Sequence, residues 1–199
     1  MTVPSLCSPV VGRLEPYVPA SSAHRGPREA QHQREPYPPS PRAVAAIEAA
    51  ARAGLQLYPD PQSLALRETI AAHHGLEAGQ VFVGNGSDEV LAHAFFAFFQ
   101  HAGQPLLMPD ITYSFYRVYC RLWGIAPELQ PLDEGLAIDV ERIAARAAEG
   151  ACAGIVLANP NAPTGMGLPL SQIERLLRPA RNAWCWLMRP TSISAARAP

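Results

Sequence analysis

The stretch QVFVGNGSDE (residues 80–89), followed by VLAHAFFAFFQ (90–100), decides the fold class of this chain of 199 residues. The short apolar run at 80–83 predicts a buried strand, the glycines predict a tight turn, and the residues after them predict a strongly apolar helix. Strand, turn and helix together form a βα unit. Because the turn leads into a helix N-terminus, its free N–H groups and the helix dipole favour an anion such as a phosphate.

The same alternation of strand and helix continues along the chain as far as residue 177. Further strands are predicted at 105–110, 128–132 and 154–159, and helices at 41–54, 63–75, 114–124, 138–150 and 171–177. Alternation of this kind predicts an α/β fold with a mostly parallel sheet covered by helices. Residues 1–41, which are rich in proline and polar, predict an extended N-terminal arm.

Composition excludes several classes of function. The chain is 48% hydrophobic and 17% charged with a net charge of −1, which argues against a disordered chain and against a basic nucleic-acid-binding face. All sixteen basic residues are arginine, and there is no lysine. The cysteines are widely spaced, no secretory signal is recognised, and no apolar run is long enough for a membrane helix. We therefore expect a cytoplasmic protein that binds a small molecule and neither nucleic acid nor membrane.

Three predicted turns lie where an open α/β sheet binds ligands, beyond the carboxyl ends of its strands. In the first, Ser87 and Asp88 suit a phosphate site, although either would also serve as an ordinary helix N-cap. In the second, Tyr113 could stack on a planar ring or simply belong to the core. The third, LANPNAPTG (157–165), is more specific, because its two prolines rigidify a loop that presents Asn159 and Asn161 after a buried strand.

A metal site is not predicted. His73 and His74 are adjacent, so on a helix their side chains are expected to point apart, and no third ligand has suitable spacing. A solvated helix end is the simpler interpretation of this pair. The charged residues Arg142, Arg146 and Glu149 are likewise interpreted as an exposed helix face.

Five segments in order resemble histidinol-phosphate aminotransferase, a family of pyridoxal-phosphate enzymes with the aspartate-aminotransferase fold. They are YPPSP (37–41), YPDPQS (58–63), GNGSDEVL (84–91), PDITYSFY (109–116) and ANPNAPTG (158–165). The resemblance implies the first part of a three-layer α/β/α large domain of fold type I, spanning residues 42–177. It also implies amino transfer between glutamate and imidazole acetol phosphate in histidine biosynthesis, with histidinol phosphate and 2-oxoglutarate as substrates, in a homodimer.

The resemblance also implies roles for individual residues. Gly86, Ser87 and Asp88 would cradle the phosphate of pyridoxal 5'-phosphate, and Tyr113 would stack on its ring. Tyr58 would reach the phosphate held by the neighbouring subunit, and Asn161 would bond to the ring oxygen. Many relatives carry Asn directly before Pro-Thr-Gly, where this chain has Ala162, so Asn159 stays open as an alternative to Asn161.

The resemblance further implies that parts of the active site are missing from these residues. Transamination needs a lysine that binds the cofactor covalently and moves a proton, and with no lysine in the chain no catalytic residue is assigned. The segment Asp-Glu-Ala-Tyr expected of the family is also absent. We therefore expect an inactive N-terminal fragment. The alternatives are an enzyme resembling threonine-phosphate decarboxylase, and a non-enzymatic product of a damaged gene.

Residues 178–199 show no helix or strand pattern, and they stand where the family has a strand that ends in Asp-Glu-Ala-Tyr. Read one base out of frame, the codons of Leu187 to Thr191 permit that segment. A shift by one base also permits the family's Leu-Asn-Thr-Asn-Glu-Asn-Pro in place of residues 30–36. We therefore interpret 25–36 and 178–199 as out of frame.

Overall fold

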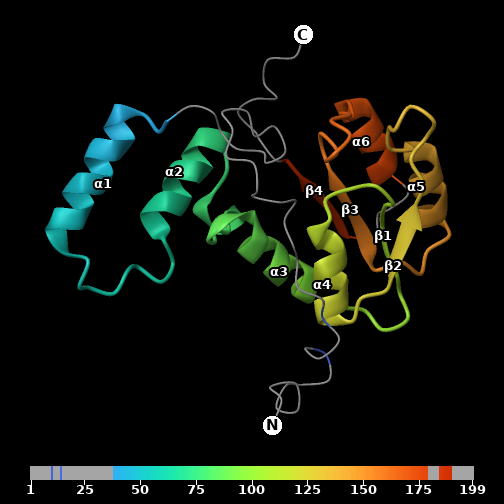
Figure 1. The fold of residues 1–199 in the computed structure, drawn as a ribbon, viewed down its shortest axis with the longest axis horizontal. Coiled ribbons are helices and arrows are strands. Elements are labelled where there is room, and N and C mark those ends of the chain that lie inside the picture. The colour runs from blue at the N-terminus through green and yellow to red at the C-terminus, as the bar shows by residue number, and fades with distance from the viewer. Residues whose placement is uncertain (1–9, 11–13, 15–37, 179–183, 190–199) are drawn as a thin grey trace, which may run out of the picture. The chain divides into compact units, whose positions relative to one another are not determined.

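The computed structural model describes residues 10, 14, 38–178 and 184–189, which form parts of two compact units (Figure 1). The helical unit comprises residues 16–85, and the sheet unit comprises residues 1–15 and 86–199. Most of the predicted arm at 1–41, and all of the segment 25–36 interpreted as out of frame, lie outside the described residues.

The helical unit contains α1 (Pro41–Gly54), α2 (Leu64–His74) and the 3-10 turn η3 (Ala78–Gln80). The Ser40 hydroxyl caps α1 by accepting from the Ala43 N–H at 3.2 Å, and both predicted helices are confirmed. α1 has no buried residue, and its apolar side chains Val44 and Ile47 are among the exposed ones. Asp60 holds the start of α2 by accepting from the Leu64 N–H at 2.7 Å.

The buried strand predicted at 80–83 is wrong. Gln80 ends the 3-10 turn, residues 81–84 have no regular structure, and the Phe82 side chain is 66% exposed. Part of the reason is the Arg67 guanidinium, which donates to the carbonyls of Ala78 and Val81 at 2.7–3.1 Å. The Val81 carbonyl therefore has a side-chain partner in place of a neighbouring strand, which the apolar pattern could not reveal.

The two adjacent histidines also differ from expectation. They lie at the exposed end of α2, as predicted, but their rings do not point apart. The ring centroids of His73 and His74 are 4.9 Å apart in an edge-to-face arrangement. Within the described residues no group of three or more potential ligands could hold a metal ion.

The sheet unit is built on a four-stranded parallel sheet in the order β2-β1-β3-β4 (Figure 1). The strands are β1 (Leu106–Pro109), β2 (Pro127–Gln130), β3 (Gly154–Ala158) and β4 (Trp184–Met188). The helices are α3 (Gly86–Phe99), α4 (Phe115–Trp123), α5 (Val140–Ala148) and α6 (Leu170–Leu177). The strands and helices predicted between residues 86 and 177 are confirmed.

Strand β4 corrects the interpretation of residues 178–199 as a tail without strand structure. Residues 184–188 pair in parallel with β3, in register from Gly154 and Trp184 to Ala158 and Met188. The run WCWLM is apolar throughout, and a strand beside β3 lets it place alternate side chains against both layers of helices. The presence of a strand does not test the reading frame, so the interpretation of residues 178–199 as out of frame stays a prediction.

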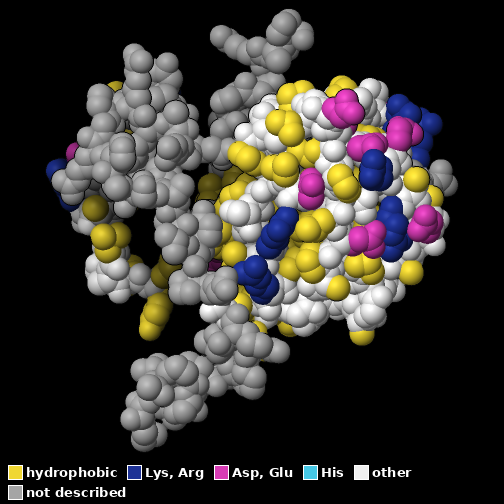
Figure 2. All heavy atoms as spheres, turned by 45° about the vertical axis from the view of Figure 1, so that its right-hand side comes forward, with side chains coloured by type: hydrophobic (Ala, Val, Ile, Leu, Met, Phe, Trp, Pro, Cys, Tyr) yellow, Lys and Arg dark blue, Asp and Glu magenta, His cyan; other side chains and the backbone are white. Residues whose placement is uncertain are grey.

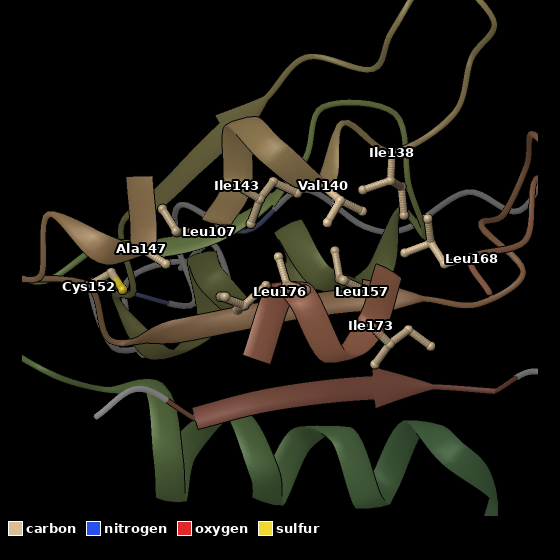
Figure 3. Packing of buried hydrophobic residues seen from close by; sticks show 11 residues of the cluster. Leu107, Ile138, Val140, Ile143, Ala147, Cys152, Leu157, Leu168, Ile173 and Leu176 are labelled. Carbon is tan, nitrogen blue, oxygen red and sulfur yellow. The ribbon is translucent and has the colours of Figure 1, made fainter. Parts of the chain in front are cut away.

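Alternation of side chains along the strands divides the core of the sheet unit in two. The aliphatic core lies between the sheet and α5 and α6 (Figure 3), and it includes Leu107, Ile143, Ile155, Leu157 and Leu176. The aromatic core lies on the other face with α3 and α4, and it includes Phe95, Phe99, Met108, Tyr116 and Tyr119. Helices thus cover both faces of the sheet, which confirms the three-layer α/β/α arrangement.

The surface over α5 and α6 carries charges of both signs. Figure 2 shows arginine and acidic side chains interspersed on this side of the molecule. Arg142 pairs with Asp139 at 3.2 Å, Arg146 with Glu128 at 2.8 Å, and Arg175 with Glu141. These partly exposed pairs contribute little to stability, and they agree with the interpretation of α5 as having a solvated face. In the part of the chain that the structure describes, no helix combines the length and the apolar character needed to cross a membrane.

Candidate functional site

The N-terminus of α3 lies in the sheet unit and presents the first backbone N–H groups of a helix. The helix begins at Gly86, whose φ of +78° is in the left-handed region, and an added Cβ there would meet nothing within 4 Å. Ser87 and Asp88 therefore lie in the exposed first turn, and the alternative that either is an N-cap is wrong. The first N–H groups of a helix have no partner within it, so this end is suited to an anion.

Tyr113 connects the loop after β1 to this helix end. Its hydroxyl donates to the Asp88 Oδ1 atom at 3.0 Å. Its ring lies 6.0 Å from that of Phe115 in a stacked arrangement and 5.5 Å from that of Tyr116 edge to face. The side chain is only partly buried, so Tyr113 borders the aromatic core and keeps some exposed surface.

Tyr119 also contacts this helix end, and the sequence analysis did not predict its role. The buried Tyr119 hydroxyl donates to the backbone carbonyl of Asp88 at 2.9 Å. Burial, and next the nearby Asp88 carboxylate, raise the pKa of the Tyr119 phenol well above its ordinary value. Tyrosines at helical spacing are common in cores, so no pattern in the sequence marked this one.

The loop after β3 contains two asparagines that the structure uses differently. Asn159 bonds to the backbone of Leu168 through both ends of its amide, donating to the carbonyl at 3.1 Å and accepting from the N–H at 2.7 Å. The Asn161 amide nitrogen donates to the Ile111 carbonyl at 3.0 Å and to the Thr164 hydroxyl at 3.1 Å. The Asn161 side chain is 1% exposed, and its Oδ1 atom has no hydrogen-bond partner.

These bonds bring together three turns that are far apart in the sequence. The contact between Asn161 and Ile111 joins the loops after β3 and β1, which are adjacent strands, and the contact between Tyr113 and Asp88 extends the connection to α3. The Thr112 hydroxyl, in the loop after β1, is also buried without a partner. A buried polar atom without a partner is costly. The Thr112 hydroxyl and the Asn161 Oδ1 atom are therefore the atoms of these loops most suited to bind a ligand or a water.

The structure does not test the predicted role of Tyr58. This residue lies in the helical unit, in the loop between α1 and α2, and its side chain is fully exposed. The other predicted residues, Gly86, Ser87, Asp88, Tyr113 and Asn161, all belong to the sheet unit. Contact between Tyr58 and a neighbouring subunit therefore stays a prediction.

Comparison with known proteins identifies the family of this chain. The model of the family Aminotransferase class I and II matches residues 30–188. A histidinol-phosphate aminotransferase of Acetobacter pasteurianus is 51% identical over 171 residues, which cover 85% of this chain and 46% of the relative. One of Gluconacetobacter diazotrophicus is 54% identical over 172 residues, which cover 86% and 47%. This chain thus spans about half the length of the curated relatives it matches.

A solved structure supports the fold. The histidinol-phosphate aminotransferase from Sinorhizobium meliloti in complex with pyridoxal-5'-phosphate matches with a TM-score of 0.68 at 23% identity, covering 75% of this chain and 40% of that one. At this identity the match shows the fold alone, and it confirms the predicted fold class. Because the family model matches well over half of its residues, this chain belongs to the aminotransferase class I and II family, whose members act on small-molecule substrates.

Proposed function

We propose that this chain forms the cofactor-binding part of a histidinol-phosphate aminotransferase and that it binds pyridoxal 5'-phosphate at the carboxyl edge of β1 and β3. The observation that carries the proposal is the orphaned Oδ1 atom of Asn161. It belongs to a loop that hydrogen bonds connect, through the loop after β1, to an aromatic ring and a helix N-terminus. A phosphorylated aromatic ring needs these three features: a polar contact at its edge, an aromatic face and an anion site.

The residues present fit this group. The first N–H groups of α3 are suited to the phosphate, and Tyr113 offers an aromatic surface. The Asn161 Oδ1 atom is an acceptor, so it would accept a hydrogen bond from a ring hydroxyl. Asn159 is a poorer candidate, because both ends of its amide are already bonded to Leu168. When bound, pyridoxal 5'-phosphate supplies the aldehyde and the electron-withdrawing ring that amino transfer requires.

The proposed substrates follow from the relatives. Identities of 51% and 54% to proteins named histidinol-phosphate aminotransferase favour histidinol phosphate and 2-oxoglutarate for the whole enzyme. These 199 residues contain no lysine, so they offer no amine side chain that could bind the cofactor covalently and move a proton. We expect that on their own they bind the cofactor reversibly and transfer no amino group.

Titration of the purified chain with pyridoxal 5'-phosphate tests the binding site. We expect saturable quenching of tryptophan fluorescence, weakened about tenfold in Asn161→Ala, which is the size of one well-placed hydrogen bond. Thr164→Ala is the matched control, since it removes a partner of Asn161 and leaves the Asn161 Oδ1 atom in place. No saturable binding by the unaltered chain, or equal affinity in Asn161→Ala, would contradict the proposal.

Assays with substrates test the reaction. The 199 residues, given histidinol phosphate, 2-oxoglutarate and cofactor, are expected to form no glutamate, and borohydride is expected to fix no cofactor to a side chain. Glutamate above background would overturn the expectation of inactivity. Release of carbon dioxide from threonine phosphate would favour the decarboxylase alternative.

Sequencing of the coding DNA tests the proposal that residues 25–36 and 178–199 are out of frame. Codons that restore Asp-Glu-Ala-Tyr after Trp186 would support an ordinary aminotransferase gene. Codons that do not permit that reading would reject the proposal and leave β4 as the native strand at this position.

Two further properties belong to the same proposal. A homodimer would suit the helical unit, where Tyr58 is fully exposed and α1 buries none of its residues. Light scattering after size exclusion would measure the oligomeric state.

A cytoplasmic location would suit the free thiols of Cys120, Cys152 and Cys185, because thiols persist in a reducing compartment.

A further inference from the structure

The resemblance assigns Asp88 to the phosphate, but its carboxylate is a poor ligand for an anion. Asp88 and Glu89 are both acidic residues in the first turn of α3. They interact favourably with the helix dipole, yet they repel a phosphate bound at the same helix end. If Asp88 helps to bind the cofactor, its carboxylate must do something other than contact the phosphate.

Two hydrogen bonds to Asp88 indicate another role for this residue. Its Oδ1 atom accepts from the Tyr113 hydroxyl at 3.0 Å, and its backbone carbonyl accepts from the Tyr119 hydroxyl at 2.9 Å. One residue of the first turn of α3 is therefore held at both its side chain and its backbone. Both donors are phenols, one from the loop before α4 and one from α4 itself.

The Tyr113 ring lies at the border of the aromatic core. Phe115 and Tyr116 contact it, but the side chain stays partly exposed. A partly exposed aromatic side chain can occupy more than one staggered rotamer, and a hydrogen bond at its polar end favours one of them. The hydrogen bond from the Tyr113 hydroxyl to Asp88 supplies such a restraint, and it ties the ring to the first turn of α3, whose N–H groups are suited to an anion.

We infer that Asp88 is a positioning residue whose carboxylate holds the Tyr113 ring in the orientation that stacks on the cofactor ring, while the phosphate is bound by the backbone of the same turn. The inference rests on the proposed function. It predicts that Asp88 matters for the aromatic part of the ligand and not for its phosphate.

A double-mutant cycle between Asp88 and Tyr113 tests the inference. Pyridoxal 5'-phosphate, pyridoxal without phosphate, and inorganic phosphate are the three probes, and each is titrated by tryptophan fluorescence. Asp88→Ala and Tyr113→Phe are each expected to weaken binding of both ring-containing probes by about tenfold, as for one hydrogen bond to a charged group. The double variant should lose no more than either single variant. Affinity for inorganic phosphate should stay the same or rise in Asp88→Ala.

Two variants separate positioning from charge. Asp88→Asn retains an acceptor oxygen for Tyr113 and should restore most of the affinity for pyridoxal, whereas Glu89→Gln removes a neighbouring charge and should leave that affinity unchanged. Near-ultraviolet circular dichroism checks that each variant is folded, and Tyr113→Phe, which removes the donor of the same hydrogen bond, replaces Asp88→Ala if that variant does not fold. Additive losses, or equal effects of Asp88→Ala and Glu89→Gln, would overturn the inference while leaving the proposed function intact. An unaltered chain that binds phosphate and neither ring-containing probe would overturn both.

Discussion

The two faces of the central sheet are built from different kinds of residue. The aliphatic core, against α5 and α6, contains no aromatic side chain among its buried members. The aromatic core, against α3 and α4, contains Phe95, Phe99, Tyr116 and Tyr119. Phenol hydroxyls on this second side bond to Asp88 and to the Met188 sulfur, whereas the buried members of the aliphatic core carry no hydroxyl. The comparison indicates that one face mainly supports the sheet and the other also shapes the candidate site.

The largest expected effect comes from removing the centre of the aromatic core. The Phe95 ring is fully buried, and it lies 5.2–5.8 Å from the rings of Phe99, Tyr116 and Tyr119. We expect Phe95→Ala to lower the free energy of unfolding by about 3–5 kcal/mol, measured by urea denaturation. Ile143→Val in the aliphatic core is the comparison, with an expected loss of about 1 kcal/mol. A loss from Phe95→Ala no larger than that from Ile143→Val would contradict the central place of the aromatic core.

Gly154 tests how closely the aromatic core approaches the sheet. A Cβ added at this position of β3 would lie 2.5 Å from a ring atom of Phe99 and 2.5 Å from the carbonyl of Trp184. Gly154→Ala should therefore force α3 or β4 to shift and cost about 1–3 kcal/mol. Gly79→Ala is the control, because an added Cβ there meets nothing within 4 Å. Equal stability of the two variants in thermal melts would show that Phe99 and β4 can move to accommodate the added Cβ without cost.

The buried phenols predict an alkaline limit to stability. Burial raises the pKa of Tyr116 and Tyr119 far above the ordinary value, so the folded state keeps protons that the unfolded state loses above about pH 10. Their contribution is present in full below that pH, and stability should fall as the pH rises beyond it. Urea denaturation between pH 8 and pH 11 measures the decline. Tyr119→Phe should make it less steep, and an unchanged slope would contradict the assignment to this phenol.

A smaller effect is expected at the start of α5, on the aliphatic side. The Asp139 side chain caps this helix by accepting from the Arg142 N–H at 3.0 Å, and this bond holds the pKa of the carboxyl below its ordinary value. Asp139→Ala should cost about 1 kcal/mol, whereas Asp139→Ser should retain most of the cap. A lowered pKa in the folded state means that the contribution is present above about pH 4 and is lost as the pH falls below it. If Asp139→Ala has the stability of the unaltered chain at pH 7, the cap contributes nothing.

Prediction from the sequence succeeded where a short pattern determines the local structure. Strong periodicity identified the helices from α1 to α6, and apolar runs identified β1 and β3. The prediction from the sequence was wrong at two short apolar segments. It placed a strand at 80–83, where there is none, and no strand at 184–188, where β4 forms. Arg67 bonds to the carbonyl of Val81 in the first, and β3 pairs with the second. Pairing with a strand or a side chain distant in the sequence decided both, and periodicity contains no information about it.

The sequence by itself determined the alternation of helices and strands, the family to which the chain belongs, and the absence of any lysine among its residues. Those properties depend on residue type and on spacing along the chain. Only the tertiary structure decided that Asn159 bonds to Leu168 while the Asn161 Oδ1 atom is buried without a partner. Only the tertiary structure showed that Tyr113 and Tyr119 hold Asp88. The physical reason is that hydrogen bonding and burial depend on which side chains meet in space, and the loops after parallel strands meet only once the sheet has formed.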